Sequence, residues 1–129
     1  IELPDAKGTL RRLSDTKGKV VLLDFTAYSL SASKARTLEL RELYNRFSPK
    51  GFEIYQVSLD ANEHYWQTMC EHLPWLCVYD ANGETSQYIQ LYQVHKIPSF
   101  FLINKAGDLV ARMEQIEDLE KTIAKLCNE

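Results

Sequence analysis

Sulfur and imidazole side chains are scarce in this sequence. Its 129 residues include three cysteines, Cys70, Cys77 and Cys127, and no two of them are spaced as C-x-x-C. The three histidines lie far apart along the chain, and no combination of His, Cys and Asp has the spacing of a structural zinc site. We therefore expect neither a metal ion nor any other cofactor.

Long apolar runs and an excess of basic charge are also missing. No segment approaches the roughly 20 apolar residues that a membrane-spanning helix requires. Eighteen acidic residues against fifteen basic ones give a net charge of -3, which argues against nucleic acid and anionic membranes as partners. A hydrophobic content of 45% suits one compact domain over residues 1–129. Because the chain begins at Ile1, we expect this domain to be the mature or C-terminal part of a longer precursor.

The most informative stretch covers residues 20–36. Residues 20–25 form an almost continuous apolar run, which predicts a strand buried on both faces. Three serines follow, and residues 34–47 then carry apolar side chains at helical spacing. A buried strand that turns directly into a helix N-terminus is a place where α/β proteins position reactive groups, because the free N–H donors there stabilise negative charge.

The remaining segments alternate between strand and helix. The pattern predicts strands at 52–59, 75–79, 100–103 and 109–113, and helices at 60–73 and 85–92. A last helix is expected from the spacing of Ile116, Leu119, Ile123 and Leu126. The order β-α-β-α-β-α-β-β-α is typical of an α/β domain with helices on both faces of a central sheet.

Residues 20–34 resemble the thioredoxin superfamily, in particular its TlpA/ResA-like branch, whose pattern is approximately V-V-L-x-D/N-F-W-A-x-W-C-x-x-C-[KR]. The matching positions are Val20, Val21, Leu22, Asp24, Phe25, Ala27 and Lys34. Leu30 and Ser33 stand where the family has its two cysteines, so that Leu30-Ser31-Ala32-Ser33 replaces C-x-x-C. Dithiol exchange needs an attacking thiolate and a second thiol that resolves the mixed disulfide, and neither leucine nor serine can supply them.

A second match lies at Ile97-Pro98-Ser99-Phe100, which resembles the I/V-P-T-x loop of the superfamily. In the family this proline is cis, and the loop faces the cysteine pair and presents backbone groups to an extended peptide. The resemblance implies a thioredoxin fold, a three-layer α/β/α structure with a central mixed sheet, a TlpA-like N-terminal extension and a central insertion. It also implies export, either to a bacterial periplasm or as a membrane-anchored lipoprotein.

Asp24 is the charged residue of most interest. The resemblance places it beneath the second cysteine position, where family members use an acid to assist proton transfer. Here its neighbour would be Ser33. A carboxyl group in an apolar strand has a raised pKa unless hydrogen bonds satisfy it, so Asp24 is either a hydrogen-bonded structural remnant or a working acid or base.

The cysteines also admit two interpretations. Cys70 shares an apolar helix stripe with Trp66, and Cys127 follows Leu126 on the inner side of the last helix, so each is expected to be a buried free thiol. The alternative is a disulfide between Cys70 and Cys77, which an exported protein could keep.

Two functional hypotheses follow. In the first, the domain is redox-inactive, and a groove formed by Tyr28, Ser29, Leu30, Ile97 and Pro98 binds a peptide, a protein or another domain of the same precursor. In the second, the protein is a thiol-disulfide oxidoreductase that uses Cys70 and Cys77. We favour the first, because function belongs to a site and the family's dithiol is missing here.

Overall fold

The computed structural model describes residues 1–29, 31–71, 73–94, 99–113 and 119–128, with the side chains of residues 31–34, 84 and 113 left undescribed. A five-stranded sheet in the order β5-β4-β3-β6-β7 forms the middle layer. Its strands are β3 (Val20–Thr26), β4 (Phe52–Ser58), β5 (Leu76–Tyr79), β6 (Ser99–Ile103) and β7 (Leu109–Met113). β3 pairs in parallel with β4 and antiparallel with β6, so the sheet is mixed.

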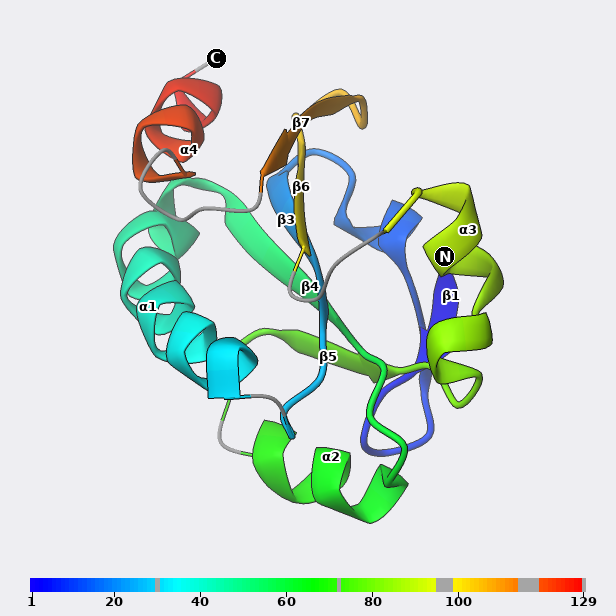
Figure 1. Cartoon of the computed structure of the whole chain (residues 1–129). Helices are drawn as coiled ribbons and strands as arrows, with labels where there is room; N and C mark the ends of the chain where they lie inside the picture. The colour runs from blue at the N-terminus through cyan, green and yellow to red at the C-terminus, as the bar shows by residue number, and fades with distance from the viewer. Residues whose placement is uncertain (30, 72, 95–98, 114–118, 129) are drawn as a thin grey trace.

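The helices cover both faces of this sheet (Figure 1). α1 (Ser31–Phe47) and α4 (Leu119–Cys127) lie together on one face, and the short α3 (Gln87–Leu91) lies on the other. α2 (Glu63–Cys70) packs near β5. All seven residues of β3 are buried, which explains why its sequence is apolar on both faces except at Asp24 and Thr26.

Side-chain alternation along the strands divides the core into two halves. Val20 and Leu22 face α1 and α4, whereas Val21, Leu23 and Phe25 face the layer that contains α3. Asp24 lies on the same side of β3 as Val20 and Leu22 and therefore projects towards the α1 face.

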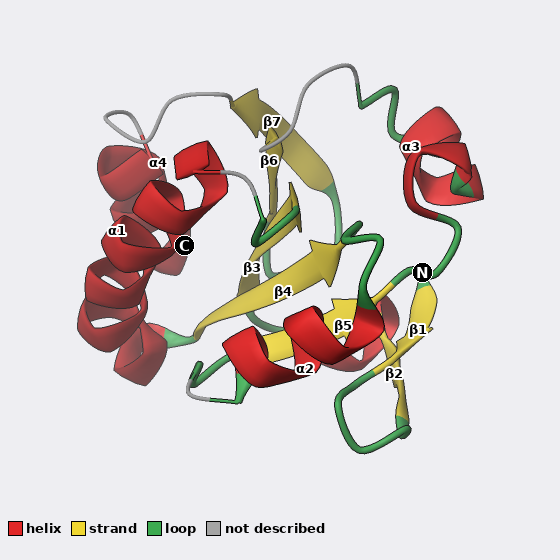
Figure 2. Ribbon diagram, turned by 60° about the horizontal axis from the view of Figure 1, so that its bottom comes forward, coloured by secondary structure: helices red, strands yellow, loops and turns green. Residues whose placement is uncertain are grey.

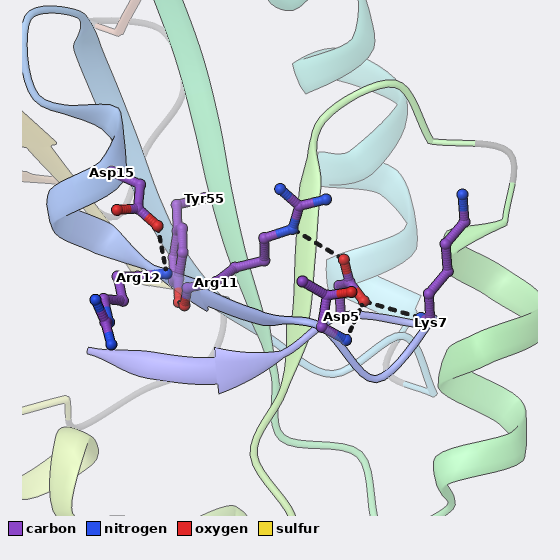
Figure 3. A network of polar contacts seen from close by, with 7 residues as sticks. Asp5, Lys7, Arg11, Arg12, Asp15 and Tyr55 are labelled. Carbon is purple, nitrogen blue, oxygen red and sulfur yellow. Dashed lines mark hydrogen bonds and ion pairs between the residues drawn. The ribbon is translucent and has the colours of Figure 1, made fainter.

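A two-stranded hairpin, β1 (Glu2–Pro4) and β2 (Leu10–Arg12), precedes the central fold and lies beside β5 (Figure 2). The Asp5 carboxylate closes its turn by accepting hydrogen bonds from the backbone N–H groups of Lys7 and Thr9, at 2.9 and 3.0 Å, and from Arg11 Nε at 2.9 Å (Figure 3). The Tyr55 hydroxyl, which comes from β4, donates to the Arg11 carbonyl at 2.7 Å and ties the hairpin to the sheet (Figure 3).

The predicted α/β architecture is confirmed, and most differences concern element boundaries. The helix expected to continue to Leu73 ends at Cys70, where Leu73 N–H bonds to the Cys70 carbonyl in a tight turn before Pro74. The helix expected at 85–92 is divided, because Ser86 has an extended backbone and caps α3 by accepting from Tyr88 N–H. Ile116 lies outside the described residues.

Candidate functional site

The short connection between β3 and α1 is held by a buried carboxylate. Asp60, just beyond the end of β4, accepts hydrogen bonds from the backbone N–H groups of Tyr28 at 2.9 Å and Ser29 at 3.0 Å. The Ser58 hydroxyl donates to the same carboxylate at 2.6 Å. Both oxygens of Asp60 are therefore occupied, and the turn at the family's active-site position has a fixed backbone. The helix expected at 60–73 begins at Glu63 and is capped by Asn62, so Asp60 lies before it.

Only part of the predicted groove can be placed. Ser29 is exposed at this turn. Tyr28 was expected to line the groove, but this is wrong: its side chain is 1% exposed, because the phenol is directed into a buried polar cluster. Leu30, Ile97 and Pro98 lie outside the described residues, and Ser33 lies in α1 with its side chain undescribed. Their proximity and the cis peptide bond stay predictions.

Asp24 belongs to a row of polar side chains that crosses three neighbouring strands. Asp24 on β3 pairs in register with Gln56 on β4, and Gln56 pairs in register with Cys77 on β5. We refer to Asp24, Gln56 and Cys77 as the polar row. Gln56 Nε2 donates a hydrogen bond to Asp24 Oδ2 at 2.7 Å, whereas Asp24 Oδ1 has no partner among the described residues.

Burial dominates the electrostatics of Asp24. The residue is 1% exposed, and desolvation raises the pKa of its carboxyl from 3.8 to about 7, although the Gln56 hydrogen bond and the positive charge of Arg36 both act to lower it. The Arg36 guanidinium lies over the ring of Phe100, 5.9 Å from its centroid, and Phe100 is the residue that pairs with Asp24 across β3 and β6. A carboxyl group with a pKa near neutrality can hold or release a proton under physiological conditions.

Gln56 connects the acid to a thiol. Its side-chain oxygen accepts hydrogen bonds from the Tyr28 hydroxyl and, at 3.0 Å, from Trp75 Nε1. Cys77 Sγ lies 3.8 Å from the same oxygen and 3.5 Å from the Tyr28 hydroxyl. Gln56 was not expected as a site residue, although an amide in the middle of a buried strand is a signal that could have revealed it.

All three cysteines are buried free thiols. The Cys70 thiol, at the end of α2, and the Cys77 thiol influence each other: their interaction lowers the pKa of Cys70, while the same interaction and burial raise the pKa of Cys77 well above its ordinary value. Cys127 lies apart at the end of α4, where burial raises its pKa. The predicted contact of Cys70 with Trp66 and the core is present, whereas a disulfide between Cys70 and Cys77 stays a prediction.

The described residues offer no other obvious chemistry. No group of three or more His, Cys, Asp or Glu side chains is arranged to hold a metal ion within the part of the chain that the structure describes. None of the described helices is long and apolar enough to cross a bilayer. What the arrangement provides is a turn held by Asp60, a buried acid on β3 and, two strands away on β5, the Cys77 thiol, which interacts with Cys70 of α2.

Several solved structures of bacterial proteins share this architecture. An uncharacterized thioredoxin-like protein from Bacteroides vulgatus is 55% identical, with a TM-score of 0.92, and the match covers 99% of this chain and 84% of that one. The thioredoxin domain of a thiol-disulfide oxidoreductase from the same species is 33% identical, with a TM-score of 0.90 and coverage of 99% and 93%.

Sequence comparison leads to the same group of proteins. The thiol-disulfide oxidoreductase ResA of Oceanobacillus iheyensis is 32% identical over 100 residues, which cover 76% of this chain and 50% of that protein. This chain spans between 22% and 50% of the length of the first curated relatives it matches, nucleoredoxins among them. The profile of the Thioredoxin-like family matches residues 18–109. Together with the mixed sheet and the helices on both its faces, these matches show that the chain belongs to the thioredoxin-like family and has the thioredoxin fold.

Proposed function

We propose that this domain is a non-catalytic binding module that uses the surface of the family's active site without its redox dithiol. The observation that carries this proposal is the position of sulfur in the chain. The only three cysteines lie in α2, β5 and α4, and the turn between β3 and α1 contains none. Thiol exchange at that turn would need two thiols there.

The proposed binding surface consists of Ser29, Leu30, Ile97 and Pro98. The Asp60 carboxylate fixes the backbone at Ser29, so this part of the surface would lose little conformational entropy when a partner binds. Leucine in place of the attacking cysteine makes the surface more apolar, which favours contact over exchange. The partner is an extended peptide segment, from another protein or from another domain of the same precursor.

We also propose that the domain is exported. The support is the resemblance of residues 20–34 to the TlpA/ResA-like branch, which implies export. Fractionation of the native host, with detection of the full-length protein, tests this proposal, and recovery in the cytoplasmic fraction alone would contradict it.

The first test of the binding role is an insulin-reduction assay driven by dithiothreitol. We expect no turnover above background from the native sequence, and turnover at least about tenfold above background from Leu30→Cys/Ser33→Cys, because thiols at a helix N-terminus have lowered pKa values. Turnover by the native sequence would overturn the non-catalytic role.

The second test measures binding directly. A panel of extended peptides with apolar residues is titrated into the isotopically labelled protein, and we expect amide shifts at Ser29 and Ser99, which border the surface. Leu30→Ser should weaken binding about tenfold, as expected for a lost apolar anchor. Leu38→Ser is the matched control, because it makes the same substitution at an exposed leucine of α1, which is 69% exposed. Equal weakening by both variants, or shifts confined to other surfaces, would contradict the proposal.

A second candidate function is thiol-disulfide exchange with turnover through Cys70 and Cys77. The specific observation that favours it is that both thiols line one pocket and alter each other's pKa. It predicts insulin reduction by the native protein that is lost in Cys70→Ser.

A further inference from the structure

A pocket of about 670 Å³ opens between the tip of the β1–β2 hairpin and α2, and both Cys70 and Cys77 line it. The hairpin supplies one wall through Lys7 and Arg11, with Lys7 at the tip (Figure 3), and α2 supplies the other through His64. Both thiols therefore border a space that a small molecule can enter, although each residue is only 7% exposed.

We propose that Cys70 and Cys77 form a reversible redox site, at which a low-molecular-weight disulfide enters this pocket and converts the two thiols into an intrachain disulfide. The site lies on α2 and β5, away from the β3–α1 turn, so this inference does not rest on the binding function proposed there. It requires a single exchange and no turnover, so a negative insulin assay leaves it intact.

The surroundings of the two thiols assign their roles. Cys70 is the attacking residue, because its interaction with Cys77 lowers its pKa, although burial and the carboxylates of Asp5 and Glu71 act in the opposite direction. Arg11 already pairs with Asp5 at 2.9 Å, which reduces the effect of that carboxylate. Cys77 is the resolving residue, because it lies beside the buried Tyr28 hydroxyl and Gln56 amide, and because its interaction with Cys70 and its burial both raise its pKa.

The chemistry balances in two steps. The Cys70 thiolate attacks one sulfur of the incoming disulfide, the sulfur–sulfur bond breaks, and the first small thiolate leaves and takes up a proton. Cys77 then loses its proton to the second departing thiolate as its sulfur attacks Cys70 Sγ. Two protein thiols are oxidised by two electrons, and one small disulfide is reduced to two thiols.

Disulfide formation also bears on the polar row. Cys77 Sγ lies within 4 Å of both the Tyr28 hydroxyl and the Gln56 oxygen, and Gln56 holds Asp24 through its amide N–H. A new bond from Cys77 to Cys70 repositions the sulfur at one end of the row, so the environment of the Gln56 amide changes. Oxidation in the pocket therefore changes the surroundings of Asp24 beneath the β3–α1 turn.

The test uses the reduced full chain in a Cys127→Ser background, which removes the third thiol, and oxidised glutathione as the probe. Intact mass should fall by two hydrogen atoms, peptide mapping should join Cys70 to Cys77, and dithiothreitol should reverse both changes. Nuclear magnetic resonance of the folded protein should show the Gln56 side-chain amide signals shifting with oxidation, while those of Asn45 on the outer side of α1 stay in place.

Single variants separate the two roles. Cys77→Ala should accumulate a glutathione mixed disulfide at Cys70, and Cys70→Ala should stay unmodified. Circular dichroism checks that each variant is folded, and if Cys77→Ala is not, Cys77→Ser is used. The proposal is overturned if the folded native chain keeps both thiols free, if the mixed disulfide forms on Cys77 instead, or if oxidation only links separate chains.

Discussion

The β3–α1 turn and the pocket beside α2 stand at the two ends of the same row of side chains, yet they hold different chemistry. Beneath the turn lies an acid, Asp24, with no sulfur in the turn itself. At the pocket lie two thiols, and Gln56 connects the two ends. The comparison teaches that a buried polar row crosses the parallel strands of this chain although its turn carries no cysteine.

The largest expected effect is on the pH dependence of stability, and it comes from Asp24 at one end of the polar row. Its pKa of about 7 in the folded protein exceeds the ordinary 3.8, so the folded state binds more protons than the unfolded state between these values. This group therefore stabilises the folded state most below about pH 4, and its contribution falls as pH rises to about 7. Over this range the contribution of Asp24 to the free energy of unfolding falls by about 4 kcal/mol at most.

The expected outcome is that Asp24→Asn removes this slope. Urea unfolding at a series of pH values from 4 to 8 should show a flatter dependence for the variant than for the native protein. Glu42→Gln, which changes an exposed carboxyl on α1, serves as the control and should keep the native slope. Identical curves for native protein and Asp24→Asn would show that Asp24 is ionised throughout.

An intermediate effect concerns the turn itself. Asp60→Ala should destabilise the protein by about 3 kcal/mol, because the N–H groups of Tyr28 and Ser29 lose a buried charged acceptor. Asp80→Ala is the matched control: Asp80 is equally buried, at 3% exposed, and accepts from Ser86 and the Asn82 N–H. Chemical denaturation should show losses of similar size for both variants.

Only Asp60→Ala should change the backbone at the turn. Hydrogen exchange of the Tyr28 and Ser29 amides should accelerate in Asp60→Ala and stay as in the native protein in Asp80→Ala. Equal acceleration in both would mean that these amides exchange through global unfolding, and that the turn has no local support of its own.

The smallest expected effect tests the link between the two regions. Tyr28→Phe removes the hydroxyl that contacts both Gln56 and Cys77, while Trp75 continues to donate to Gln56. We expect a loss of about 1 kcal/mol in unfolding free energy, the value of one hydrogen bond. The reactivity of Cys77 towards a thiol reagent should change while that of Cys127 stays constant, and equal changes at both would indicate a general loosening.

The fold could be predicted from the sequence, because the spacing of apolar residues and the turn residues indicate its strands and helices directly. The run from Val20 to Thr26 is apolar because that strand is covered on both faces, and the helical spacing of Leu40, Leu43 and Phe47 places α1 on one of them. The ends of the helices were harder to predict, because they depend on single capping interactions such as those of Asn62 and Ser86.

The site could be predicted from the sequence only in part, because strand register and burial determine which side chains come together. Asp24 was identified from its position in a familiar pattern, but its partner Gln56 lies 32 residues away and becomes its neighbour only through the pairing of β3 with β4. Tyr28 was misplaced for the same reason: a tyrosine in a turn is usually exposed, and here tertiary contacts with Gln56 and Cys77 direct it inwards.

The N-terminal hairpin also protects the sheet from other chains. β5 is the outer strand on its side of the sheet, and β1 lies beside it (Figure 2). An uncovered outer strand offers free backbone groups to any passing strand and so invites aggregation. Removal of residues 1–12 would therefore reduce solubility at high protein concentration even where the five-stranded sheet still folds.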